Sequence, residues 1–207
     1  MNIGLLQTDR GNLAAAERHL EESLSRSRQI GHISMEGKVY LHYSSFWLAA
    51  KEWEKSLFYS NRALEILNEI GSQESQVDLY ASIGEAWLGL GDIGKAKEAS
   101  QMALDCCEMG AMPNREHGRV LRLLGNIDRL ERDYDSALEK LKESVDIFST
   151  LNNQLELGRT FVALAQFEKD RNNLQGARIH AREAGMIFNR LGAGLEIKNV
   201  DQMNIRQ

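Results

Sequence analysis

Apolar side chains recur at spacings of three and four residues along most of the chain, which is the period of one face of an α-helix. Tyr40, Tyr43 and Trp47 form one such run. The same spacing returns in Tyr80, Ile83 and Trp87, and in Leu138, Leu141, Val145 and Phe148. Burying one side chain of this size contributes roughly 1.5–3 kcal/mol, so each helix needs a neighbour to pack against. The pattern therefore predicts an all-α protein of amphipathic helices.

Short polar segments separate these helices and reveal an internal repeat. Their third residues are Leu13, Trp53, Ile93, Tyr134 and Leu174, at intervals of 40, 40, 41 and 40 residues. Small residues stand three positions after and nine positions before each of them: Ala16, Ser56, Ala96, Ala137 and Ala177, and Gly4, Ser44, Gly84, Gly125 and Ala165. Because small side chains let two helices approach closely, each pair predicts the crossing point of a helical hairpin.

The repeat register predicts five hairpins, over residues 1–31, 32–71, 72–110, 111–152 and 153–192. Each closes at a glycine or asparagine, which tolerate the left-handed conformation that ends a helix. We expect the hairpins to stack into one right-handed α-solenoid domain over residues 1–193. A last helix in 194–207 either caps the array or continues it. Because the first helix of the first hairpin is short, we expect the sequence to be a fragment of a longer protein.

Two of the repeats carry a family resemblance. Tyr80-x2-Ile83-Gly84-x2-Trp87 followed by Ala96, and Leu121-x2-Leu124-Gly125 followed by Ala137, resemble the tetratricopeptide repeat. The usual unit has about 34 residues and ends with proline, whereas this one runs 40 and ends with glycine. The longer form is similar to that of bacterial signalling and transcriptional regulators and of some cell-polarity scaffolds. Asp128 and Glu168 replace the aromatic residue of the first helix in the last two repeats.

Composition supports this architecture and excludes several classes of protein. The 207 residues include only one proline, so the chain is poor in this helix breaker for its length. The net charge of −5 gives no bulk attraction to nucleic acid or to an anionic membrane. No apolar run approaches the roughly 20 residues of a membrane span, and the N-terminal residues lack the features of a signal peptide. We therefore expect a cytoplasmic protein with no membrane or nucleic-acid partner.

The candidates for chemistry are weak. The string from Gly89 to Ala96 matches a phosphate-binding loop through Lys95, but alanine stands where that loop needs serine or threonine. It also follows a helical pattern instead of a strand, so we interpret it as a hairpin turn. The histidines, at 19, 32, 42, 117 and 180, have no metal-ligand spacing, and Cys106 and Cys107 fit small core positions. We expect neither an enzyme nor a bound cofactor or metal.

The resemblance implies a peptide-binding groove. In tetratricopeptide repeats, the second, fifth, ninth and twelfth residues of each first helix commonly line the concave surface. The positions so implied are Lys38, Leu41, Ser45, Leu48, Asp78, Glu85, Arg119, Arg122, Asn126, Arg129, Arg159, Gln166 and Lys169, with Ala81, Leu88 and Val162 at apolar points. Arg122 and Asn126 match part of the pattern with which some relatives bind a C-terminal carboxylate.

The basic groove residues allow two interpretations. Arg119, Arg122 and Arg129 share one helical stripe, and guanidinium groups suit carboxylates, so the stripe predicts binding of an acidic peptide or protein surface. The alternative is a solvated stripe that nearby carboxylates balance, with Glu116, Asp128, Glu131 and Glu156 as the candidates.

Three functions fit the sequence. The first is a non-catalytic scaffold that binds a protein or peptide in its groove. The second is a regulatory or sensory segment of a larger signalling or transcription protein. The third is self-association through exposed solenoid ends, such as Ile3, Leu5, Leu195 and Ile197.

Overall fold

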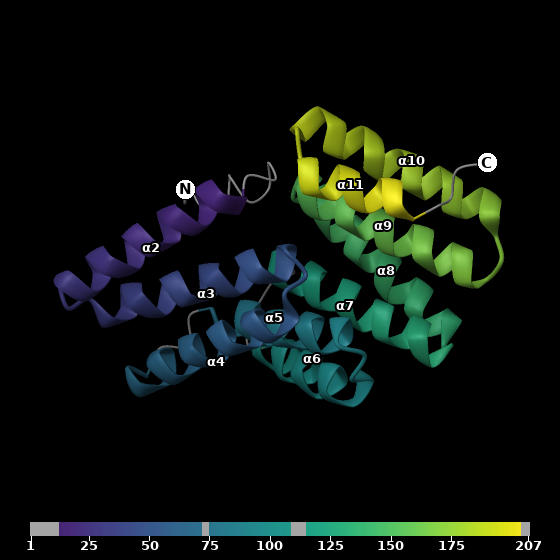
Figure 1. The fold of residues 1–207 in the computed structure, drawn as a ribbon. Coiled ribbons are helices and arrows are strands. Elements are labelled where there is room, and N and C mark those ends of the chain that lie inside the picture. The colour runs from purple at the N-terminus through teal and green to yellow at the C-terminus, as the bar shows by residue number, and fades with distance from the viewer. Residues whose placement is uncertain (1–12, 72–74, 109–114, 204–207) are drawn as a thin grey trace. The chain divides into compact units, whose positions relative to one another are not determined.

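The computed structural model describes residues 13–71, 75–108 and 115–203, and within these ranges it contains helices and turns but no strand. The helices are α2 (Leu13–Gln29), α3 (Ile33–Ala49), α4 (Trp53–Glu69), α5 (Gln76–Gly89), α6 (Ile93–Glu108), α7 (Arg115–Glu131), α8 (Tyr134–Thr150), α9 (Gln154–Asp170), α10 (Leu174–Leu191) and α11 (Gly194–Gln202) (Figure 1). The predicted all-α class is confirmed.

The chain divides into two compact units, Met1–Met109 and Gly110–Gln207. In the first unit α3 packs on α4, α5 on α6, and α4 joins the two hairpins by packing on α5. In the second unit α7 packs on α8, α9 on α10, and α8 on α9. This is the predicted stacking of antiparallel hairpins. The one proline of the chain, Pro113, and the predicted short opening helix lie outside the described residues.

Left-handed backbone marks the same place in successive repeats. Gly91 closes its hairpin with φ +83°, and Lys51, Arg132 and Asn172 hold the equivalent positions with φ between +60° and +66°. The repeats end in the same conformation at Gly31, Gly71, Asn152 and Gly192. Three of the four described hairpin turns therefore place a residue with a side chain where glycine is sterically favoured. Asp92, Asp133, Asn173 and His32 then cap the helices that follow.

Small residues lie at the hairpin crossings, as predicted. Ala16, Ser56, Ala96, Ala137 and Ala177 are all fully buried. A side-chain carbon added to Gly125 would lie 2.9 Å from Cγ of Leu141 and 3.2 Å from the carbonyl oxygen of Ala137. In the second repeat, the Oγ atoms of Ser44 and Ser60 are 2.6 Å apart, and Ser56 donates to the carbonyl oxygen of Ser44. The predicted partner Gly4 lies outside the described residues.

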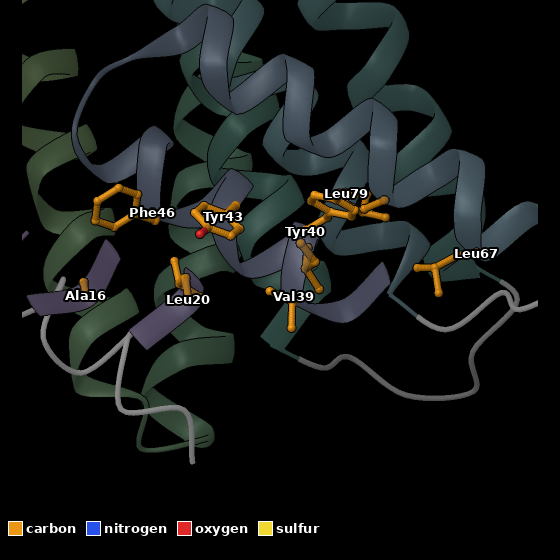
Figure 2. Close-up of a cluster of buried hydrophobic side chains, with 10 residues drawn as sticks. Ala16, Leu20, Val39, Tyr40, Tyr43, Phe46, Leu67 and Leu79 are labelled. Atoms are coloured by element: carbon orange, nitrogen blue, oxygen red, sulfur yellow. The ribbon is translucent and has the colours of Figure 1, made fainter. Parts of the chain in front are cut away.

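Each unit buries its own core. In the first, one cluster joins Leu20 of α2, Val39, Tyr43 and Phe46 of α3 and Leu67 of α4 (Figure 2). In the second, one cluster joins Phe148 of α8 and Leu157 of α9 to Ala184, Ile187 and Phe188 of α10. Both α8 and α10 thus turn one face inward around α9.

The aromatic-to-acid replacement noted in the sequence changes the contacts of that position. In the first unit the Lys55 ammonium lies 4.0 Å from the Trp47 ring centre, and Lys95 lies at the same distance from Trp87. In the second unit the equivalent Asp128 accepts from Lys140 at 2.6 Å. A cation–π contact has thus been replaced by an ion pair at one register position.

Candidate functional site

The predicted groove residues of the second unit lie on the first helices, α7 and α9, which pack against each other. We call the face that carries Arg119, Arg122, Asn126, Arg129, Arg159, Gln166 and Lys169 the first-helix strip. Helix α11 follows as the next first helix and adds Glu196. The strip is therefore built from three helices of consecutive repeats.

The middle of the strip is an ion pair withdrawn from solvent. Nη2 of Arg122 lies 2.7 Å from Oε2 of Glu156, and the side chains are 9% and 8% exposed. The same guanidinium donates from Nη1 to the carbonyl oxygen of Glu156 at 3.2 Å and lies over the Phe148 ring. Arg119 is buried to a similar degree, with 8% of its surface exposed. Neither arginine is the solvated residue that one of the two sequence interpretations assumed.

Arg159 extends the ion pair to the next helix. It donates from Nη1 to Oε1 of Glu156 at 2.8 Å and from Nε to Oε1 of Glu196 at 2.7 Å. One guanidinium thus connects the carboxylates that stand near the starts of α9 and α11. Its side chain is 28% exposed, which makes it more accessible than Arg122.

Opposing effects act on the Glu156 carboxyl. Burial by itself raises its pKa, but the charges of Arg122, Arg159 and Arg119 outweigh that effect and hold the pKa below its ordinary range. Glu156 is therefore a carboxylate in the folded protein. The strip already binds one carboxylate, which belongs to the chain itself.

Further along the strip the cations also have partners. Arg129 pairs with Asp170, and Lys169 donates to the carbonyl oxygen of Met203 at 3.1 Å. Oδ1 of Asn126 and Nε of Arg129 are buried, and neither has a hydrogen-bond partner among the described residues. A free acceptor and a free donor thus lie on neighbouring turns of α7.

The carboxylates expected to balance the arginine stripe behave differently from one another. Glu156 does pair with Arg122, and Glu116 pairs with Arg115 at 2.8 Å. Asp128 instead binds Lys140 and accepts from Ser136 on α8. Of the stripe arginines, Arg122 is thus balanced by Glu156, although it is buried and not solvated.

The predicted positions of the first unit form a less charged strip. Leu41 and Ala81 are buried, and Lys38, Ser45, Leu48, Asp78 and Glu85 are half-buried. They lie on α3 and α5, which contact each other as α7 and α9 do. The structure thus places them on successive first helices, as the resemblance implies.

Sequence reasoning did not single out Asp170, Glu196 or Thr160 and named Glu156 only as a counter-charge. A signal was present within the second unit, because glutamate recurs at 40-residue intervals in Glu116, Glu156 and Glu196. In the first unit Glu36, which lies one register position later in its repeat, also accepts from an arginine, Nε of Arg28, at 3.0 Å.

The glycine-rich string forms a hairpin turn, as interpreted. Helix α5 precedes it, and Nζ of Lys95 lies 3.1 Å from Oδ2 of Asp92 as well as over Trp87. Cys106 and Cys107 are half-buried instead of lying in the core, and burial raises the pKa of the Cys106 thiol. Among the residues with described side chains, no group of three or more histidine, cysteine or acidic residues is arranged to hold a metal ion.

Comparisons with solved structures identify the fold. The chain superposes on BtubC from P. vanneervenii with a TM-score of 0.64 and 18% identity, covering 91% of this chain and 78% of that one. Aspartyl phosphate phosphatase F from Bacillus subtilis gives a TM-score of 0.66 at 17% identity over 96% of this chain, which spans only 52% of the phosphatase. A kinesin light chain from Podosopora anserina with TPR-like repeats gives 0.56 at 14% identity, covering 86% and 91%.

These likenesses show a helical-repeat fold of the tetratricopeptide type, as the repeat pattern predicted. A scan against models of protein families finds no match, and neither does a search of curated proteins. No helix in the described part of the chain is both long and apolar enough to cross a membrane.

Proposed function

We propose that the chain is a non-catalytic scaffold whose first-helix strip in residues 115–203 binds an acidic peptide or protein segment. The observation that carries the proposal is the Glu156 carboxylate, which lies among Arg119, Arg122 and Arg159. Guanidinium groups bind carboxylates through several charge-assisted hydrogen bonds, so a strip that gathers several arginines favours an acidic ligand.

Two parts of the strip are suited to meet a ligand. Arg159 is partly exposed and Lys169 is exposed, so each side chain can contact an incoming carboxylate without any rearrangement of the core. Oδ1 of Asn126 and Nε of Arg129 have no partner among the described residues but are buried, so a peptide backbone would pair with them only if neighbouring side chains moved aside. The net charge of −5 gives no bulk attraction to nucleic acid or to an anionic membrane.

The test uses the exposed cations, because a reversed charge at Arg122 would face Glu156 inside the core. We would measure binding of fluorescent peptides that differ only in the number of glutamates, by anisotropy, to the 207-residue chain. We expect affinity to rise with glutamate content, to fall about tenfold in the variant Arg159→Gln with Lys169→Glu, and to weaken with salt.

Arg182→Glu is the matched control, since Arg182 is an exposed arginine on α10, outside the strip. Affinity that does not depend on glutamate content, or that falls equally in the control, would contradict the assignment of the strip.

A regulatory segment of a larger protein is the second candidate. The observation in its favour is that nearly all of this chain superposes on about half of a bacterial aspartyl phosphate phosphatase. The gene that encodes the chain tests it: an adjoining DNA-binding or catalytic domain supports regulation, and its absence supports a free-standing scaffold. Self-association through the solenoid ends loses one of its candidate residues, because Ile197 packs on the core of the second unit.

A further inference from the structure

The outer helices of the second unit, α8 and α10, carry opposite charges. The exposed side chains of α8 include Asp135, Glu139, Glu143 and Asp146, with Lys142 as the exposed cation among them. The spacing of these carboxylates, four, four and three residues, keeps them on one face of the helix. The acidic face of α8 denotes these four residues.

The exposed side chains of α10 are basic and apolar. They include Arg178, Arg182 and Arg190, together with Ile179 and Met186, each of which is 52% exposed. Glu183 is the acidic residue of α10, and it is only half-buried and lies 3.5 Å from Nδ1 of His180. Arginine and methionine are enriched where proteins meet, whereas aspartate and glutamate are depleted there. The basic face of α10 denotes these five arginine and apolar residues.

The two faces match in length and direction. Asp135 to Asp146 spans 11 residues and Arg178 to Arg190 spans 12, which correspond to about 16 and 18 Å along a helix. Because α8 and α10 are both second helices of antiparallel hairpins around α9, they run in the same direction within one chain. A two-fold axis parallel to these helices, lying between the two copies, therefore sets α8 of one copy against α10 of the other with the two helices parallel.

In that arrangement the charges pair in order. Asp135 stands opposite Arg178, and Glu139 stands opposite Arg182. Asp146 then stands opposite Arg190. The two-fold axis repeats each pair, so the contact is self-complementary and closes as a dimer. No other surface is needed, because one copy supplies both the acidic and the basic face.

We propose that the outer layer of the second unit is a homodimer interface, in which the acidic face of α8 contacts the basic face of α10 of a second copy. This interface is separate from the first-helix strip, so neither proposal depends on the other. Exposed ion pairs are individually weak and are screened by salt, so the dimer forms at high protein concentration and dissociates at high ionic strength.

The experiment is a charge swap followed by sedimentation velocity. The wild-type chain is measured from about 10 μM to about 1 mM, at about 50 mM and about 1 M salt. We expect a concentration-dependent shift from monomer to dimer at low salt that disappears at high salt. The basic-face variant, Arg182→Glu with Arg190→Glu, and the acidic-face variant, Glu139→Lys with Glu143→Lys, each associate about tenfold more weakly or not at all.

The decisive arm mixes the two variants. Each chain then offers the face that the other lacks, so an equimolar mixture forms heterodimers although neither variant dimerises alone. Recovery in the mixture also shows that both variants are folded. The strip variant Arg159→Gln with Lys169→Glu is the matched control and keeps the wild-type dimer.

A wild-type chain that stays monomeric at every concentration, or a mixture that stays monomeric while circular dichroism shows both variants folded, overturns the proposal. If a variant does not fold, Arg182→Gln with Arg190→Gln removes the charge without adding repulsion and carries the same expectation of weaker association. A monomeric wild type whose basic face binds labelled RNA or acidic vesicles assigns that face to a different occupant and equally overturns the dimer.

Discussion

The Arg122 guanidinium and the Glu156 carboxylate lie 2.7 Å apart, and more than nine-tenths of each side chain is buried. The two residues are 34 positions apart in sequence and stand on first helices of consecutive repeats. Burial removes both charges from water, a cost that their attraction and the surrounding hydrogen bonds must offset. Removing only one of the two charges is therefore costly, because it leaves the other buried without its partner.

This asymmetry predicts the outcome of a double-mutant cycle. Arg122→Met leaves Glu156 buried with fewer cations and is expected to lower the free energy of unfolding by about 3–5 kcal/mol. Arg122→Met combined with Glu156→Met removes both charges and is expected to cost less than the single change. Urea unfolding of the single and double variants measures the difference. A double variant that loses the sum of the losses of Arg122→Met and Glu156→Met would show that the pair is not coupled.

The depressed pKa of Glu156 predicts how stability depends on pH. The unfolded chain takes up a proton at this carboxyl near pH 4.3, while the folded protein keeps it ionised to lower pH. The contribution of Glu156 is therefore complete above about pH 4.3 and is lost as the pH falls toward its folded-state pKa. Urea titrations between about pH 6 and pH 3 should show a smaller loss of stability with falling pH in Glu156→Gln than in the wild type. Identical slopes would contradict the assignment.

The left-handed turn residues predict stabilising substitutions. Arg132 holds φ +66° in its hairpin turn, a conformation that costs a residue with a side chain roughly 1–2 kcal/mol. Arg132→Gly relieves that cost at the expense of a more flexible unfolded chain, and we expect a net gain of about 0.5–1 kcal/mol. Asn172→Gly should gain less, because asparagine tolerates this conformation. Thermal unfolding measures both, and a loss of stability in Arg132→Gly would show that its side chain contributes more than its backbone costs.

The hairpin crossing predicts opposite effects for two glycines. A methyl group at Gly125 would lie 2.9 Å from Leu141, so Gly125→Ala should destabilise the protein by about 1–3 kcal/mol. At Gly185 a methyl group meets nothing within 4 Å, and alanine is the better helix former, so Gly185→Ala should stabilise by about 0.5–1 kcal/mol. Both variants add one methyl group, so they differ only in the space available for it. Similar effects at both sites would contradict the close approach at the crossing.

The repeat pattern predicted the helices and their turns because those features depend on residues close in sequence. Gly125 and Ala137 mark a crossing through their size alone, and Arg132 and Asn172 hold the turn position that glycine holds at Gly91. These properties recur every 40 residues and are visible without coordinates. The helices and turns of the described residues could therefore be predicted from the sequence.

The burial of Arg119 and Arg122 could not be derived in the same way. Their register places them on the first-helix face, but their exposure depends on how closely α9 lies against α7. The contacts between these two helices join residues far apart in the chain, such as Arg122 and Thr160, which are 38 positions apart. The sequence pattern gives the position of a residue on its helix but not the distance between helices. The arginine stripe, which one of the two interpretations took as solvated, is therefore found to be largely internal.

The charge links between successive repeats make the order of the hairpins matter. Glu156 and Glu196 each occupy the third residue of a first helix and each accept from an arginine of the hairpin before, Arg122 and Arg159 respectively. A repeat moved elsewhere in the array would leave its acidic residue facing a neighbour without that arginine. Growth of this array by duplication of a single hairpin in the second unit would therefore have to copy a donor and an acceptor together. The units that look interchangeable by length are matched to their neighbours by charge.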